Sequence, residues 1–154
     1  MANAWDTIIV KSANQTVTNN VTPQNDTELF TSVVSGGFYW VEFHLLYSGN
    51  DTTGDYRARF TFAAASTALG IFTYPAATFT PTTTALNAAA LFPSPDMICG
   101  CDLAASVRPV FMQFQFRASG GSGTLQWQFA NSAAAAGSDS ITIAGSTLRI
   151  KRLS

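Results

Sequence analysis

Hydrophobic and polar residues alternate with a period of two along most of the chain, and this alternation predicts β-strands. It is clearest over residues 38–47. One face of this predicted strand carries Tyr39, Val41, Phe43, Leu45 and Tyr47, and the other carries Phe38, Trp40, Glu42, His44 and Leu46. Because both faces contain apolar side chains, we expect a central strand with the core on one side and a second packed surface, such as a neighbouring subunit, on the other.

Three further segments alternate in the same way. Residues 55–62 are expected to form a hairpin with 38–47, and 107–117 are expected to pair with 124–131 through the Gly-rich residues 119–123. Shorter strands are predicted over 7–12, 16–19, 28–33, 71–74, 141–143 and 148–153. No useful stretch has a helical period. The sequence therefore predicts an all-β, two-sheet antiparallel β-sandwich, jelly-roll-like, of about eight to ten strands.

The segment 75–95 departs from this pattern, because it is dominated by Thr, Ala and Pro, and proline cannot donate to a strand ladder. We predict an N-terminal arm over residues 1–6 and a single domain over 7–154, with a long loop or excursion at about 75–95. The predicted contacts with a partner protein are apolar residues of the arm and the excursion, namely Trp5, Phe79, Leu86, Leu91 and Phe92. Two alternatives remain open: an ordered surface loop, and a Trp5 that folds back onto its own domain.

Composition restricts the classes of partner. Hydrophobic residues make up 47% of the chain and charged residues 11%, against about 25% charged residues in an average soluble protein. The net charge of −1 gives no electrostatic footprint for nucleic acid. The apolar segments are far shorter than a membrane span, and no secretory leader is recognisable. We therefore expect synthesis in the cytoplasm, with no contact to nucleic acid or membrane.

Residue types that carry chemistry are few. His44 is the only histidine and lies in an apolar strand, so we expect a packed or interfacial role for it. Cys99 and Cys101 give at most half a zinc site. We expect them to be buried reduced thiols, with a strained local disulfide as the alternative. The nine carboxylates are scattered beside turns. We predict no catalytic residue, no cofactor and no metal site.

Five segments together resemble small virion proteins of tailed bacteriophages. They are 25–29, 39–47, 54–60, 125–130 and 145–153, which read NDTEL, YWVEFHLLY, GDYRARF, LQWQFA and GSTLRIKRL. The resemblance covers about residues 10–62 and 110–153. Members of this group occur as capsid decoration (cement) proteins and as tail or fibre components, and they work by contact. Symmetric trimers are common among the decoration proteins.

The resemblance implies a non-enzymatic structural protein of a virion. Our leading hypothesis is a capsid decoration protein, made in the host cytoplasm, that forms a homotrimer on the outer capsid surface. There it would bind the major capsid protein and stabilise contacts between capsid subunits. The alternative is a tail or fibre component that binds a host glycan, with Trp5, Trp40, Trp127 and the tyrosines as stacking platforms. A polysaccharide hydrolase is a third hypothesis, and no carboxylate spacing supports it.

Overall fold

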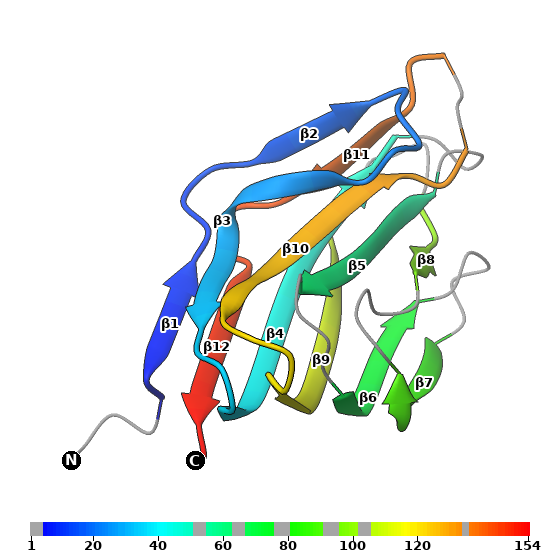
Figure 1. The fold of residues 1–154 in the computed structure, drawn as a ribbon. Helices are drawn as coiled ribbons and strands as arrows, with labels where there is room; N and C mark the ends of the chain where they lie inside the picture. The colour runs from blue at the N-terminus through cyan, green and yellow to red at the C-terminus, as the bar shows by residue number, and fades with distance from the viewer. Residues whose placement is uncertain are drawn as a thin grey trace.

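A computed structural model describes residues 5–50, 55–62, 67–75, 81–90, 96–101, 106–133 and 136–154, and for 67–75 and 81–90 it describes the backbone only. This part of the chain contains strands and turns but no helix (Figure 1). Its twelve strands are β1 (Thr7–Val10), β2 (Gln15–Thr18), β3 (Gln24–Val33), β4 (Phe38–Gly49), β5 (Tyr56–Phe62), β6 (Thr67–Pro75), β7 (Pro81–Ala90), β8 (Met97–Cys99), β9 (Arg108–Arg117), β10 (Gly123–Asn131), β11 (Asp139–Thr142) and β12 (Thr147–Arg152). The all-β prediction is confirmed, with more strands than expected.

The strands form two antiparallel sheets that pack face to face (Figure 1). The larger sheet has the order β1-β12-β4-β9-β6-β7, with β11 pairing both β2 and β4, and the smaller has the order β3-β10-β5-β8. Four of the strand pairs are nested in the sequence, as they would be in one long hairpin: β1–β12, β3–β10, β4–β9 and β5–β8. In this order the pairs belong alternately to the larger and the smaller sheet. Such wrapping is the jelly-roll arrangement, so the predicted sandwich is confirmed.

The two predicted hairpins are wrong, because their strands belong to opposite sheets. β4 pairs with β9, β11 and β12, whereas β5 pairs with β10 and β8. The strands β9 and β10 are likewise in different sheets. The alternation itself is observed in all four strands, because the side chains on one face of each strand are buried. It does not identify the partner strand, and in a jelly roll most partners are distant in sequence.

The prediction of a loop over 75–95 is wrong for Pro81–Ala90, which forms β7 and pairs with β6 at the edge of the larger sheet. The prolines fit because they lie at strand ends: Pro75 ends β6 and lies opposite Pro81, which begins β7. A strand end at a sheet edge tolerates a missing ladder donor. Residues 76–80 and 91–95 lie outside the described ranges.

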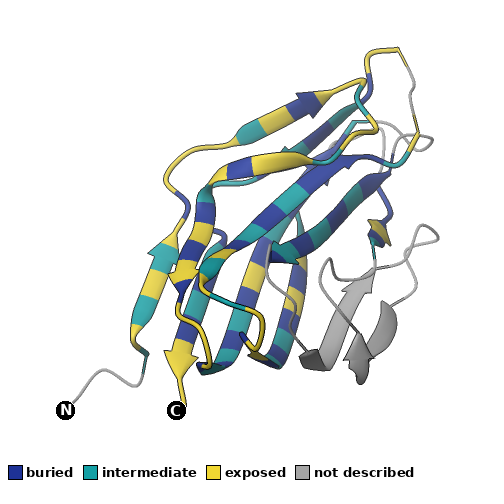
Figure 2. Cartoon of the chain, viewed as in Figure 1, coloured by how far each residue is buried: buried dark blue, intermediate teal, exposed yellow. Residues whose placement is uncertain are grey.

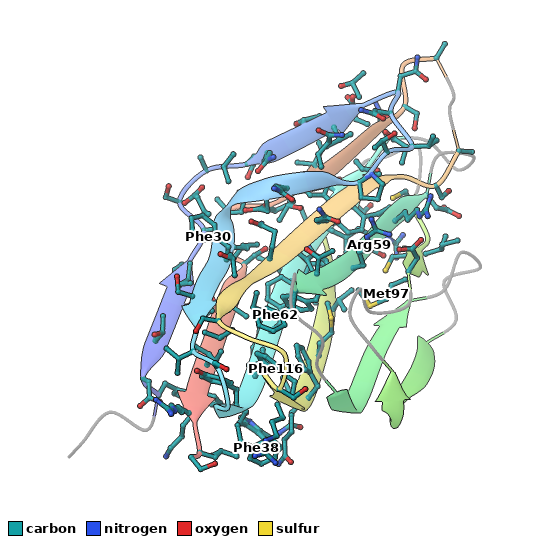
Figure 3. All side chains as sticks on the ribbon, viewed as in Figure 1. Phe30, Phe38, Arg59, Phe62, Met97 and Phe116 are labelled. Carbon is teal, nitrogen blue, oxygen red and sulfur yellow. The ribbon has the colours of Figure 1, made fainter. Side chains whose placement is uncertain are left out.

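The core lies between the sheets and consists largely of aromatic rings. Along most of β4, β5, β9 and β10, buried residues alternate with residues of intermediate or full exposure (Figure 2). Trp127 on β10 is fully buried, and its ring centroid lies 4.7 Å from that of Phe43 and 4.9 Å from that of Phe60. Phe62 and Phe116, one from each sheet, meet at 5.8 Å between the layers (Figure 3). Aromatic burial of this kind dominates the energetics of a small core.

A charged pair is also buried between the sheets. Lys11 lies in the short connection between β1 and β2, directly after the last residue of β1 that pairs with β12. Its Nζ lies 3.0 Å from Oδ1 of Asp26 on β3, and neither side chain is exposed to solvent. The same oxygen accepts the backbone N–H groups of Glu28 and Leu29. This pair connects the larger sheet to the smaller one.

Glu28 completes the cluster and gives it a testable pH dependence. Its carboxylate accepts the backbone N–H groups of Ser12 at 2.7 Å and Ala13 at 3.3 Å. These bonds, with that from Ser12 the largest cause, lower the pKa of Glu28 from 4.5 to about 2. A carboxyl group whose pKa is lowered on folding adds stability above its unfolded pKa, and that stability is lost as the pH falls through the folded value.

We expect Glu28→Gln to be less stable than the wild type at neutral pH, and the difference to shrink as the pH falls from 4.5 to about 2. Urea denaturation across that range measures the difference. Glu42→Gln is the control, because Glu42 faces outward and, among the described residues, its carboxylate has a single long ionic contact, with Arg149 at 3.9 Å. If the difference in stability between Glu28→Gln and the wild type did not change with pH, the lowered pKa of Glu28 would be contradicted.

Candidate functional site

The outer face of the larger sheet carries a row of partly apolar side chains across four strands. Val10 on β1 lies opposite Thr147 on β12, which lies opposite His44 on β4, which in turn lies opposite Phe111 on β9. Val10 is 57% exposed and Phe111 is 40% exposed. The rings of His44 and Phe111 meet edge to face at 4.8 Å. Cross-strand neighbours of this kind touch, so the four residues form one strip, which we call the outer row.

A more polar row borders the outer row. Ile8, which is also exposed, lies opposite Arg149, and Arg149 lies opposite Glu42. The guanidinium and carboxylate approach to 3.9 Å, an exposed pair that adds little to stability but cancels charge on this face. Trp40 lies on the same face of β4 and is only half-buried. An apolar strip with a polar border is typical of a protein contact surface.

Trp5 lies next to this sheet, at the beginning of the described chain. It is half-buried and directly precedes Asp6. Both the backbone N–H and the side-chain carboxylate of Asp6 form hydrogen bonds with β12. The Asp6 backbone N–H donates to Ile150 O at 3.1 Å, and its carboxylate accepts the backbone N–H of Arg152. The arm is therefore fixed to β12 at residue 6, and residues 1–4 lie outside the described ranges. Contact of Trp5 with a partner stays a prediction.

The other predicted contact residues are not brought together by the described structure. Leu86 belongs to β7, of which only the backbone is described. Phe79, Leu91 and Phe92 lie outside the described residues. Their role in binding a partner stays a prediction as well.

The cysteines lie inside the sandwich, and neither forms a disulfide. The Tyr47 hydroxyl donates to the carbonyl of Gly100, between them, at 2.9 Å. Burial, with a smaller contribution from Cys101, raises the pKa of the Cys99 thiol well above its ordinary value. A thiol that stays protonated is a poor nucleophile and a poor metal ligand, so the geometry favours a packing role.

Several carboxylates have structural partners. These partners are Lys11 for Asp26 and Glu28, Arg57 and Arg59 for Asp96, and Thr18 and Asn50 for Asp139. Within the described ranges, no group of three or more His, Cys, Asp or Glu side chains is placed to hold a metal ion. Those ranges also contain no apolar helix of membrane-spanning length.

Sequence reasoning missed most of the outer row, although the signal was present. Phe111 lies between the inward-facing Val110 and Met112, so the same alternation points it outward. Ile8 and Val10 flank the inward-facing Ile9 in the same way. Only the strand register, which the sequence does not show, brings these residues beside His44.

No model of a known protein family and no curated protein matches the chain. Among solved structures, the chain is similar to the VP2 subviral particle of infectious bursal disease virus, at 10% identity and a TM-score of 0.28, over 99% of this chain and 39% of that one. It is also similar to the Gt strain of the same virus, at 10% identity and a TM-score of 0.25, over 99% and 40%. The chain thus spans about two fifths of those chains. Scores this low do not establish a shared fold, so the fold rests on the strand pairing above.

Proposed function

We propose that the chain is a non-enzymatic structural protein of a virion, which decorates the outer capsid surface as a homotrimer. The observation that carries the proposal is the outer row, an exposed strip of partly apolar side chains on a well-packed sheet. Jelly rolls occur among viral capsid and lectin domains, and a fold alone does not select between them. The resemblance to tailed-bacteriophage virion proteins favours the virion.

Two of the five segments that carry this resemblance lie on the candidate face. Residues 39–47 lie in β4, and 145–153 include β12, so the two segments supply His44 and Thr147 at the centre of the outer row. In a closed trimer each copy would place its outer row against a different surface of the next copy. The low charge of the chain favours this, because little charge must be desolvated.

Binding to the capsid is assigned to other parts of the chain. We assign contact with the major capsid protein to Trp5 in the arm and to Phe79, Leu86, Leu91 and Phe92 in the segment 75–95. A protein that binds the assembled shell but not its separated subunits stabilises the shell by mass action, by about 2.7 kcal/mol for each site at 100 times the Kd. Many copies per particle would mark a decoration protein, whereas a few would mark a tail or fibre component.

The protomer contact is tested with Phe111→Asp, which places a charge in the outer row. We expect light scattering to show a trimer for the wild type at micromolar concentration and a monomer for Phe111→Asp. The matched control is Val34→Asp, since Val34 is 45% exposed but follows β3 in the smaller sheet. A monomeric wild type, or an equal effect of both substitutions, would refute this role of the outer row.

The capsid contact is tested by deleting residues 1–5, which removes Trp5 and leaves Asp6 with its bonds to β12. The deletion is expected to preserve the trimer and its melting temperature, and to weaken binding to purified particles. Particles that withstand heat equally well with and without the bound protein would refute stabilisation of the shell.

A further inference from the structure

The outer side of the smaller sheet contains an open depression of about 690 Å³. Its polar lining is Asn25, Thr61, Thr124, Gln126 and Gln128, and the rest of the lining is Phe30, Gly123 and the largely buried Phe62. None of its lining residues is charged. The volume falls in the range of small-molecule sites, about 300–1,000 Å³, and the composition is that of a site for an uncharged polar ligand.

The register of three strands explains why these side chains converge. Gln126 on β10 lies opposite Phe30 on β3 and Thr61 on β5, while Gln128 lies opposite Asn25 and Arg59. Between these rows β10 advances by two residues and β3 by five, a bulge that bends β3. Asp26 lies within this bulge and points inward to Lys11. The buried ion pair thereby helps to shape the depression.

Hydrogen bonds fix the amide groups before any ligand arrives. Gln128 Nε2 donates to Asn25 Oδ1 at 2.8 Å, and Gln128 Oε1 accepts from Arg59 Nε at 3.1 Å. Gln126 Nε2 donates to two backbone carbonyls, those of Asp26 and Trp127. The Gln126 Oε1 acceptor and the Asn25 Nδ2 donor have no hydrogen-bond partner among the described residues, so both remain for a ligand. Pre-ordered polar groups reduce the entropy lost on binding.

Phe30 provides the complementary apolar surface. Its side chain is 45% exposed and lies at the β3 side of the depression (Figure 3). The face of an aromatic ring is electron-rich, so it attracts the polarised C–H groups on one face of a sugar ring. Arg59 lies at the opposite margin, where its charge is partnered by Asp96 at 3.6 Å.

We propose that this depression binds a neutral oligosaccharide. Planar amides and hydroxyl groups match sugar hydroxyls, and Phe30 matches the apolar face of a pyranose. A phosphate-rich ligand would need a basic lining, and a lipid would need an apolar one. The site lies on the opposite sheet from the outer row, so this activity goes beyond decoration and does not depend on it.

The test uses the full chain on a printed array of neutral, sialylated and sulfated oligosaccharides, followed by calorimetric titration of the neutral oligosaccharide bound most strongly. Phe30→Ala is expected to weaken binding about tenfold or more. Asn25→Asp, which replaces the free donor by a charged acceptor, is expected to do the same. Ile98→Ala is the matched control, because Ile98 is similarly exposed, at 44%, and lies on β8 outside the depression and outside the outer row.

The outcomes separate this proposal from the decoration proposal. Phe30→Ala should still form a trimer by light scattering and melt like the wild type, while Ile98→Ala should still bind the oligosaccharide. Three results would overturn the glycan site: no binding to any neutral oligosaccharide on the array, binding restricted to acidic ones, or equal binding by wild type and Phe30→Ala.

Discussion

Replacing Lys11 with methionine is expected to lower the free energy of unfolding by about 3–5 kcal/mol, although methionine fills a similar volume. The cost arises at Asp26, whose buried carboxylate loses its cation. Its Oδ1 would keep the backbone N–H groups of Glu28 and Leu29, while Oδ2 already has no hydrogen-bond partner among the described residues. A buried charge left this way is among the few causes of large single-site destabilisation.

The double variant Lys11→Met/Asp26→Asn separates the charge from the packing. The amide oxygen that replaces the carboxylate of Asp26 can still accept the two backbone N–H groups, and no net charge is buried. We therefore expect the double variant to recover about half of the loss or more. Lys151→Met is the control, because Lys151 is exposed on β12. Urea denaturation gives all four stabilities. A loss in Lys11→Met no larger than in Lys151→Met would show that the pair is not buried in solution.

The sequence predicted the layers of this fold better than its connections. Alternation assigned Tyr39 to Tyr47 on β4 to two faces correctly, because side-chain period is a local property of an extended chain. It failed on pairing: it matches β4 with the next strand, whereas the partners of β4 are β9, β11 and β12, far along the sequence. Register is set by the packed core as a whole, so a nested jelly-roll order cannot be obtained from local pattern.

The functional surfaces were predictable to different degrees. The outward position of Phe111 follows from its neighbours, but its contact with His44 depends on register. The pairing of Lys11 with Asp26 was not predicted, since a lysine in a strand normally indicates a solvated position. The depression beside Phe30 depends on a bulge in β3 between Asn25 and Phe30, part of which lies outside the strand predicted over 28–33. Features built by two or three strands together therefore could not be predicted, because the sequence does not show which strands are neighbours.

Trp127→Ala is expected to cost about 3–5 kcal/mol in unfolding free energy, because it empties a fully buried ring position between the sheets. Trp127 contacts Phe43 and Phe60, and its Nε1 donates to the Tyr56 hydroxyl at 3.1 Å. Trp127→Phe should cost less, about 1–2 kcal/mol. It keeps a ring, and the Tyr56 hydroxyl retains its bond with Thr142 at 2.8 Å. Chemical denaturation of both variants measures the two costs.

Comparing Trp40→Ala on β4 with Trp127→Ala on β10 tests whether the inward and outward faces of both strands have been assigned correctly. Trp40 and Trp127 were both considered as sugar-stacking platforms, but only Trp40 faces outward, and it is half-buried. Trp40→Ala should therefore cost about 1 kcal/mol or less when measured in the Phe111→Asp background, where contacts between protomers do not contribute. Fluorescence quenching by iodide should reach Trp40 and not Trp127. If Trp40→Ala destabilised the protein as much as Trp127→Ala, the outer face of β4 would belong to a buried core, and the outer row would have to be reassigned.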